Sequence, residues 1–582
     1  MNQCCIPRFA MLFGSLCYLT LFAFSPPLHG QEKEVEQSLW EGTLDAGGQK
    51  LLMKFEFHKD QDAWKGVLHS PDEGHIEIPI SKMQTTDGQM EFMAPTVGAK
   101  FAGELSSDGL LATGIWSQNG HEIDFVLRKV DSLNLPKLKE AWQGTLKAGE
   151  TKFKLGLKIF QTGEGDLFAK LDSYSQGVKG IPVDFKQDGR QYLFSQAAMK
   201  LTYKAELSAD GKTLSGTWEQ VGTKFPLELE RMSEGFEPVA NRPQNPKGPF
   251  PYKVKKVTYE NATDKVTLGG TLTTPNGEGP FPVAILISGS GSQDRDETLF
   301  EHKPFWVIAD YLTRHGVAVL RFDDRGVGES TGVELLANST SQDFANDVQA
   351  GIDFLKTQDN IDSTKIGLIG HSEGGLIAPM VATQGDDVNF IISLAGPGVD
   401  GGKILTSQLR AAQEASGFDP DLVDAIEELT ERLVAKVNAD ETVTQEVLKE
   451  LTDEISKDLS EKSAAGFNTQ AKLLSQMMAS PWARYFIKHD PAVNWKQVRC
   501  PVLVLNGEKD LQVLADLNLP AIKSALEEAG NNKFKIVRLA NLNHLFQETE
   551  GPGLGNEYGL LEQTFSPNAL QAMSNWLDQI LP

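Results

Sequence analysis

The N-terminal part of the chain repeats itself with an offset of 102 residues. The pattern W-x-G-T-L at residues 40–44 recurs at 142–146, and GELSSDGLLATGIWSQNG at 103–120 aligns with AELSADGKTLSGTWEQVG at 205–222. Self-similarity at a fixed offset indicates one supersecondary unit used twice. We therefore expect two modules of the same fold, over residues 36–131 and 138–232.

Within each module apolar and polar residues alternate, as in LLMKFEFH and FKLGLKIF, with Asp-Gly pairs between the runs. A period of two bounded by turn residues predicts antiparallel strands, so each module should be a small all-β sandwich or barrel. The repeated tryptophans are expected to pack in the cores, with a platform for a surface polymer or another ligand as the alternative. Scattered histidines, at 58, 69, 75 and 121, favour surface positions over a metal site.

A proline-rich stretch follows the second module, over residues 233–252. It holds prolines at 238, 243, 246, 249 and 251. Such composition favours an extended, semi-rigid linker between domains.

The pattern changes from residue 253 to the end at 582. Short apolar runs now alternate with amphipathic segments of helix length, and these runs are VTLGGTLTTP, VAILISGSG, VAVLRFDD, KIGLIGHS, FIISLAG, PVLVLNGEKD and FKIVRLANLNH. Continuous Val, Ile and Leu runs separated by helices predict an α/β fold with a mostly parallel sheet.

One interval in this region, residues 401–490, is too long for a simple connection between strands. Apolar residues recur there at helical spacing, at 422, 426, 429 and 433 and again at 448, 451, 455 and 459. The interval should therefore be helical. An insertion above the carboxyl ends of parallel strands covers the place where such folds bind ligands, so we expect a helical lid.

The N-terminus has the layout of a secretory signal peptide over residues 1–30. An apolar run follows Arg8 and ends at Phe24, before two prolines and a polar stretch. The run is shorter than the roughly 20 apolar residues that span a bilayer, which favours a cleaved signal over a membrane anchor. We expect cleavage near Gly30 and export to the periplasm or beyond the cell, with no stable membrane insertion afterwards.

Composition excludes several function classes. The formal charge of -24 disfavours a nucleic-acid partner, because phosphate binding needs clustered Lys and Arg. With Cys4, Cys5 and Cys17 in the signal, only Cys500 remains, so an intrachain disulfide and a cysteine metal cluster are excluded from the mature chain. Nothing in the sequence calls for a metal, a nucleotide or another cofactor.

Two segments match Gly-x-Ser-x-Gly, GESTG at 328–332 and GHSEG at 370–374. Ser372 directly follows the strand-like KIGLIG and precedes a helix-compatible segment, which is the setting of a nucleophile elbow. Ser330 follows a loop instead, so we interpret it as loop structure. Ser372 is the candidate nucleophile.

A serine nucleophile needs a histidine as its base, and in this fold the base follows the acid along the chain. His544, after the last strand-like run, has that position. His371 is too constrained beside Ser372 to turn back onto it, and His489 lies at the end of the helical interval. His544 is therefore the predicted base.

The acid that orients this base should end a strand between Ser372 and His544. Asp510 ends VLVLNGEKD where the chain leaves the sheet, and Glu508 and Asp400 are weaker alternatives. A helix cap is the structural alternative for Asp510. For the oxyanion, the predicted donors are the backbone N–H groups of Glu373, after the nucleophile, and Ser290, in the glycine-rich turn after VAILI.

Residues 253–582 resemble the bacterial α/β-hydrolase esterases that carry a Gly-Ser-Gly-x-Gln-Asp-Arg-Asp segment. The resemblance rests on GSGSQDRD, RFDDRGVGES, GHSEGG, PVLVLNGEKDLQV and NHLFQ. It implies carboxylic-ester hydrolysis with Ser372, Asp510 and His544 as the triad. LQVLADLN lacks the proline expected soon after LQV, which bears on the loop after Asp510 but leaves the acid in place.

The expected function is that of an exported carboxylesterase acting on a small-molecule ester through an acyl-enzyme on Ser372. A serine peptidase, a thioesterase and an acyltransferase would use the same triad. A surface-polymer binding protein with an inactive hydrolase fold is the alternative outside enzymes. Acyl and alcohol specificity, the oligomeric state and the role of the two modules stay open at this point.

Overall fold

The computed structural model describes residues 37–581, apart from residues 47–48, 61–62, 74, 95–96, 119–120, 149–150, 164, 175–177, 198, 221 and 234–241. The predicted signal peptide over residues 1–30 lies outside the described residues, as do residues 234–241 of the predicted linker. The chain divides near residue 240 into two units, which are described separately. Within the described ranges, no helix is long and apolar enough to cross a membrane.

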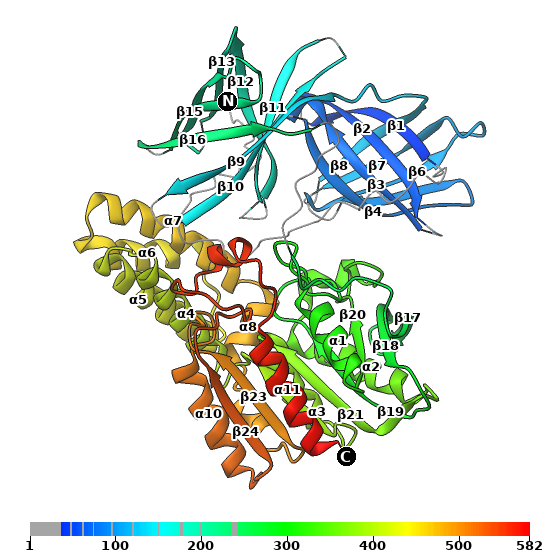
Figure 1. The fold of residues 1–582 in the computed structure, drawn as a ribbon, viewed down its shortest axis with the longest axis vertical. Helices are drawn as coiled ribbons and strands as arrows, with labels where there is room; N and C mark the ends of the chain where they lie inside the picture. Colours follow the sequence, from blue (N-terminus) through cyan, green and yellow to red (C-terminus); the bar gives the residue numbers. More distant parts are fainter. Residues whose placement is uncertain are drawn as a thin grey trace. The chain divides into compact units, whose positions relative to one another are not determined.

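The first module is a closed barrel of eight antiparallel strands (Figure 1). Each strand pairs with the next, and β1 also pairs with β8, which closes the barrel. The strands are β1 (Gln37–Ala46), β2 (Gln49–Asp60), β3 (Ala63–Ser70), β4 (Ile76–Thr86), β5 (Gln89–Ala94), β6 (Ala99–Leu105), β7 (Leu111–Gln118) and β8 (His121–Val130). The prediction of a small antiparallel module is thus confirmed, and of the two expected forms, sandwich or barrel, the module is a barrel.

The second module is also a closed eight-stranded barrel, in which β9 pairs with both β10 and β16. Its strands are β9 (Lys137–Ala148), β10 (Thr151–Gln161), β11 (Leu167–Ser173), β12 (Val178–Asp188), β13 (Gln191–Gln196), β14 (Leu201–Leu207), β15 (Thr213–Gln220) and β16 (Thr223–Arg231). The tryptophans that revealed the repeat, at 40, 116, 142 and 218, are all at most 4% exposed and belong to the barrel cores.

The repeat also preserves a glycine that each barrel needs. Gly114 and Gly216 occupy equivalent positions on β7 and β15. A Cβ atom would lie 2.1 Å from the Ala102 carbonyl oxygen in the first case and 2.0 Å from the Lys204 carbonyl oxygen in the second. Neighbouring strands therefore approach more closely there than any side chain permits.

The C-terminal unit is built on an eight-stranded sheet in the order β17-β18-β20-β19-β21-β22-β23-β24. The β17–β18 and β18–β20 pairs are antiparallel, and the remaining pairs are parallel. Its strands are β17 (Tyr252–Asn261), β18 (Val266–Pro275), β19 (Phe281–Ile287), β20 (Ala318–Phe322), β21 (Ile361–His371), β22 (Phe390–Leu394), β23 (Val502–Gly507) and β24 (Phe534–Leu539). The predicted mostly parallel sheet is confirmed.

Helices cover both faces of this sheet. On one face pack α1 (Pro304–Arg314) and α11 (Pro567–Ile580), and on the other α2 (Ser341–Lys356), α3 (Glu373–Ala382), α9 (Ala492–Trp495) and α10 (Ala515–Glu528). Successive residues of a strand point to opposite faces of the sheet, and here both faces are buried by helices. Val283 and Ala284 on β19, for example, belong to the cores on the two different faces, so both are apolar. This explains the continuous apolar runs.

The segment between β22 and β23 is helical, as predicted. It contains α4 (Gly401–Ala415), α5 (Pro420–Asn438), α6 (Gln445–Ile455), α7 (Glu461–Met478) and α8 (Pro481–Lys488). Apolar positions that revealed it, such as Ile426, Leu429 and Leu433, are fully buried in a core of the insert's own. The insert follows the carboxyl end of β22 along the chain.

Two features at the start of this unit differ from the sequence-based expectation. Strand β17 was not predicted, because the strands expected after residue 253 were all short apolar runs. In β17, buried residues such as Val257 and Tyr259 alternate with exposed ones, as in an antiparallel strand. The end of the predicted linker also packs on the unit, since the Arg242 side chain donates hydrogen bonds to the carbonyl oxygens of Phe300, Gly559 and Leu561. This part of the stretch is therefore anchored rather than a free spacer.

Cys500 packs against the core beside β23, in keeping with the packing role expected from CPVLVL. Burial raises the pKa of its thiol to about 12. A thiol so far from ionisation is a poor nucleophile at neutral pH.

Candidate active site

Ser372 lies in a sharp turn between β21 and α3. Its backbone has φ 52° and ψ -119°, a conformation that non-glycine residues rarely adopt. A Cβ at Gly370 would lie 2.0 Å from the Gly374 carbonyl oxygen, and one at Gly374 would lie 2.1 Å from the Ile287 carbonyl oxygen. The two glycines that flank the serine are thus required for the turn, as expected of a nucleophile elbow.

Asp510 and His544 form a buried acid–histidine pair. Asp510 Oδ2 is 2.9 Å from His544 Nδ1, and the two side chains are at most 4% exposed. The same oxygen accepts a hydrogen bond from Asn506 Nδ2, and Oδ1 accepts the backbone N–H groups of Gln512 and Val513. Asp510 therefore orders its own loop and orients His544, and its role as the catalytic acid stays a prediction.

His544 lies beside the elbow. Its ring centroid is 4.8 Å from that of His371, the residue before Ser372. With Nδ1 held by Asp510, the ring carries Nε2 as its second proton site, and this atom has no hydrogen-bond partner in the described part of the chain. A histidine so oriented can accept a proton from a nearby hydroxyl.

The alternative acids and bases serve other purposes. Glu508 is exposed, and its side chain accepts the backbone N–H of Asn541. Asp400 caps α4 by accepting the N–H of Lys403. His489 ends α8 and stacks on Tyr485. Within the described residues, none of these three side chains forms a hydrogen bond or ion pair with the side chain of Asp510 or His544.

The predicted oxyanion donors lie on the two segments that flank the elbow. Glu373 is the first residue of α3, where backbone N–H groups lack intrahelical acceptors. Ser290 is exposed in the turn after β19, and Gly289 before it would bring a Cβ to 3.1 Å from Ser372 Cβ. The glycine-rich turn is thus adjacent to the nucleophile, and the assignment of both donors stays a prediction.

The side chain of Glu373 has a separate role that the sequence did not reveal. Its carboxyl group is buried and accepts hydrogen bonds from Ser341 Oγ at 2.6 Å and from Trp482 Nε1 at 2.9 Å. Burial raises the pKa of this carboxyl group, although both hydrogen bonds lower it in part. Since Trp482 belongs to α8, Glu373 connects the helical insert to the elbow.

A second acid–histidine pair also escaped the sequence analysis. His371 Nδ1 is 2.8 Å from Glu297 Oε1, and His371 Nε2 is 3.0 Å from the His544 carbonyl oxygen. Glu297 stands only one residue beyond the GSGSQDRD motif, and His371 directly precedes Ser372. The sequence could have drawn attention to both residues because they adjoin the motifs. It could not show that they contact each other, since they are 74 positions apart in the chain.

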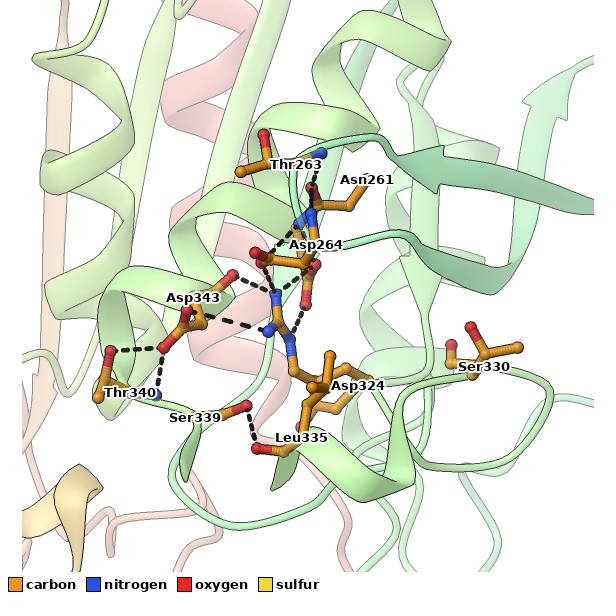
Figure 2. Close-up of polar contacts among 12 residues, drawn as sticks. Asn261, Thr263, Asp264, Asp324, Ser330, Leu335, Ser339, Thr340 and Asp343 are labelled. Carbon is orange, nitrogen blue, oxygen red and sulfur yellow. Dashed lines mark hydrogen bonds and ion pairs between the residues drawn. The ribbon is translucent and has the colours of Figure 1, made fainter. Parts of the chain in front are cut away.

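Ser330 is a structural residue, as predicted. It is 0% exposed, and its hydroxyl donates to the Asp323 carbonyl oxygen and accepts the N–H of Gly269. Figure 2 shows Ser330 in the loop after β20 and, apart from it, the polar network that contains Asp264 and Asp343. At the centre of this network, Arg325 pairs with Asp347 and Asp264, each at 2.8 Å.

A cavity of about 350 Å³ lies against the Asp510 loop, lined by Leu511, Leu514 and Arg538 among others. Neither Ser372 nor His544 lines it. It is therefore not assigned as the substrate site.

Comparisons with known proteins are consistent with this geometry. Residues 304–550 match the family described as serine aminopeptidase, S33. Esterase EstD of Thermotoga maritima is 26% identical over 294 residues, which cover 50% of this chain and 61% of that protein. Acylamino-acid-releasing enzyme 1 of Oryza sativa subsp. japonica is 25% identical over 196 residues, covering 32% of this chain and 23% of that protein.

The chain spans about three-fifths of the length of the Thermotoga esterase. Among solved structures, an esterase of Pyrococcus furiosus is 16% identical with a TM-score of 0.36, and the match covers 60% of this chain and 100% of that one. The family match and the sheet topology together support an α/β hydrolase in the C-terminal unit.

Proposed function

We propose that the protein is an exported serine carboxylesterase that hydrolyses a small-molecule ester. The observation that carries the proposal is the set of three groups at the carboxyl ends of the parallel strands: Ser372 in a strained turn, and the buried pair of Asp510 and His544 beside it. Similarity to an esterase over 294 residues supports the choice of ester as the substrate class.

In the proposed reaction, Ser372 Oγ attacks the carbonyl carbon of the ester and His544 Nε2 accepts the hydroxyl proton. His544 then passes this proton to the departing alcohol, which leaves an acyl-enzyme. Water, deprotonated by His544, then attacks the acyl carbonyl. The bond between the acyl carbon and Ser372 Oγ breaks, His544 returns the proton to that oxygen, and the carboxylic acid leaves. The Asp510 carboxylate stabilises the positive imidazole in both halves, and the N–H groups of Glu373 and Ser290 would bind the oxyanion.

Two further parts of the proposal concern the other regions. The helices α4 to α8 would act as a lid, supported by their origin at the end of β22 and by the contact of Trp482 with Glu373. Export would follow from a signal peptide over residues 1–30. The barrels would then bind a surface polymer or another ligand outside the cytoplasm.

The first experiment measures hydrolysis of p-nitrophenyl butyrate by Ser372→Ala, with Ser330→Ala as the matched control. Ser372→Ala should lose activity by roughly a million-fold, as removal of a triad serine does, and should not react with a fluorophosphonate probe. Ser330→Ala should keep both properties. Native turnover by Ser372→Ala would refute the proposal. If the folded wild-type protein does not react with the fluorophosphonate probe, the alternative of a binding protein with an inactive hydrolase fold is favoured.

The family description and the plant relative favour a second candidate, a serine peptidase that releases aminoacyl groups. An acyl-thioesterase or an acyltransferase would also use the three groups. The hydrolytic candidates are separated by measuring turnover of an ester, a thioester and an amide that carry the same aminoacyl group. Adding an alcohol as acceptor then tests for acyl transfer. Preference for the amide would replace esterase by peptidase.

A further inference from the structure

Three loops of the active site meet at the buried side chain of His371. Its Nδ1 is 2.8 Å from Glu297 Oε1, and that same oxygen accepts the backbone N–H of Gly289 at 2.8 Å. Its Nε2 is 3.0 Å from the carbonyl oxygen of His544. One imidazole ring thus connects the glycine-rich turn, the elbow and the loop that carries the predicted base.

The hydrogen-bond partners determine the protonation state of this ring. A carbonyl oxygen only accepts, and Glu297 Oε1 already accepts the Gly289 N–H. With Glu297 as a carboxylate, both ring nitrogens of His371 donate, which only the positively charged imidazolium can do. A neutral ring would place one nitrogen lone pair against an acceptor at 2.8 or 3.0 Å.

The charged groups around His371 agree with this state. Glu297 faces it from the glycine-rich turn, His544 from the loop after β24, and Asp510 acts from the loop after β23. Burial lowers the pKa of His371, but Glu297, the His544 carbonyl and Asp510 together raise it above its ordinary value. The Glu297 and His371 side chains are each 7% exposed, so little solvent screens their attraction.

A very small cavity lies against the pair. The cavity that touches both Glu297 and His371 has a volume of about 10 Å³ and is otherwise walled by apolar residues such as Leu394 and Leu545. This volume is at the lower limit for one water molecule. The pair thus contacts protein rather than substrate, and its effect on the reaction must pass through the groups that it holds.

We infer that the ion pair of Glu297 with protonated His371 is a positioning device for the reaction at Ser372. It fixes the glycine-rich turn through Gly289 and the loop of the base through the His544 carbonyl. The inference rests on the proposed hydrolysis at Ser372. Loss of the proton from His371 removes one of the two donors, so activity falls reversibly as pH rises through the pKa of His371.

The kinetic test uses His371→Gln, with His315→Gln as the control because His315 is exposed at the end of α1. His371→Gln should lower kcat roughly 10- to 100-fold, with KM within about twofold, as expected from a small displacement of catalytic groups. The fall of kcat at high pH that belongs to His371 should disappear. The control should keep the wild-type kcat and pH profile.

A second variant tests the charge separately from the shape. Glu297→Gln keeps an oxygen that can accept the Gly289 N–H but removes the negative charge opposite His371. The high-pH fall of kcat should therefore move to lower pH. A Glu297→Gln enzyme with an unchanged profile would overturn the inference.

NMR of the protein labelled with ¹⁵N-histidine gives a readout that does not depend on turnover. The His371 signals, identified by their loss in His371→Gln, should show protons on both ring nitrogens at pH 7 in wild type and in Ser372→Ala. A neutral ring, or a folded His371→Gln enzyme with wild-type kcat and profile, overturns the inference. If instead Ser372→Ala remains active, the proposed function fails, whatever the state of His371.

Discussion

The chain contains the pattern Gly-x-Ser-x-Gly twice, and the two segments have opposite environments. In residues 370–374 the serine stands in a strained turn with a partly exposed side chain, beside the Asp510–His544 pair. In residues 328–332 the serine is fully buried, and its hydroxyl bonds the backbone of Asp323 and Gly269. The comparison teaches that one five-residue pattern can place a serine hydroxyl in a buried structural network or in a partly exposed turn, and that the surrounding fold decides which.

The glycines of the two segments also have different structural roles. A Cβ at Gly370 would meet the Gly374 carbonyl oxygen inside the elbow, while one at Gly328 would lie 2.4 Å from Asp323 Oδ2. In the first segment the glycines permit a sharp turn that presents Ser372. In the second they allow the loop to wrap around a buried carboxylate.

The largest expected effect tests whether activity depends on the acid beside the first serine. Asp510→Asn should lower kcat by roughly 10⁴-fold, because an amide in place of the carboxylate leaves His544 in the wrong tautomer and unstabilised when protonated. Glu508→Gln, a change in an exposed side chain two residues earlier, should stay near wild type. Steady-state kinetics on the same ester measures both, and the reverse ranking would move the acid to Glu508.

The next effect concerns the network that anchors the loop of the second serine. Arg325→Ala leaves Asp347 and Asp264 without their buried partner, and should lower the free energy of unfolding by about 3–5 kcal/mol. Arg432 is the matched control, because its guanidinium forms ion pairs with exposed Glu428 and Glu454 on the insert, and Arg432→Ala should change stability little. Denaturant titration distinguishes the two, and equal losses would contradict the structural role of Arg325.

A smaller effect compares how much each of the two serines contributes to the free energy of unfolding. Ser330→Ala leaves the Gly269 N–H and the Asp323 carbonyl without their buried partner, so the unfolding free energy should fall by about 1–3 kcal/mol. Activity per folded molecule should remain. Ser372→Ala should show the opposite pattern, with no loss of stability, and similar losses of stability in both variants would break the comparison.

The smallest effect concerns the residue that follows the nucleophile. Glu373→Gln keeps the backbone donor and an oxygen for Trp482 and Ser341, so kcat should change by less than about threefold, within the range of a single modest hydrogen bond. Burial raises the pKa of the Glu373 carboxyl group in the fold.

Stability as a function of pH tests this pKa. Between the unfolded and the folded pKa of Glu373, the native state holds the proton more tightly, so wild-type stability falls as pH rises through this interval. Glu373→Gln cannot ionise, and should gain stability relative to wild type as pH rises above the ordinary pKa of a glutamate, about 4.3. Unfolding of both proteins at several pH values checks the sign, and a constant difference would show that Glu373 does not titrate in this way.

Much of the fold could be predicted because its signals are local. Runs such as VAILI and KIGLIG lie within single strands, and the repeated W-x-G-T-L pattern marked both barrels. Strand β17 was missed because the other predicted strands of this region are short apolar runs, whereas β17 is an antiparallel edge strand in which buried and exposed residues alternate. The anchoring of Arg242 escaped for another reason, since its acceptors lie up to 319 residues away.

The sequence by itself determined the two kinds of domain, the elbow around Ser372 and the chain order of the predicted acid and base. These depend on periodicity and on turn chemistry, which neighbouring residues encode. Only the tertiary structure decided that Ser330 is buried, that β1 closes against β8, and that His371 joins Glu297 to the His544 loop. Parallel strands bring their carboxyl ends to one edge of a sheet, and contacts between loops that meet there leave no periodic trace in the sequence.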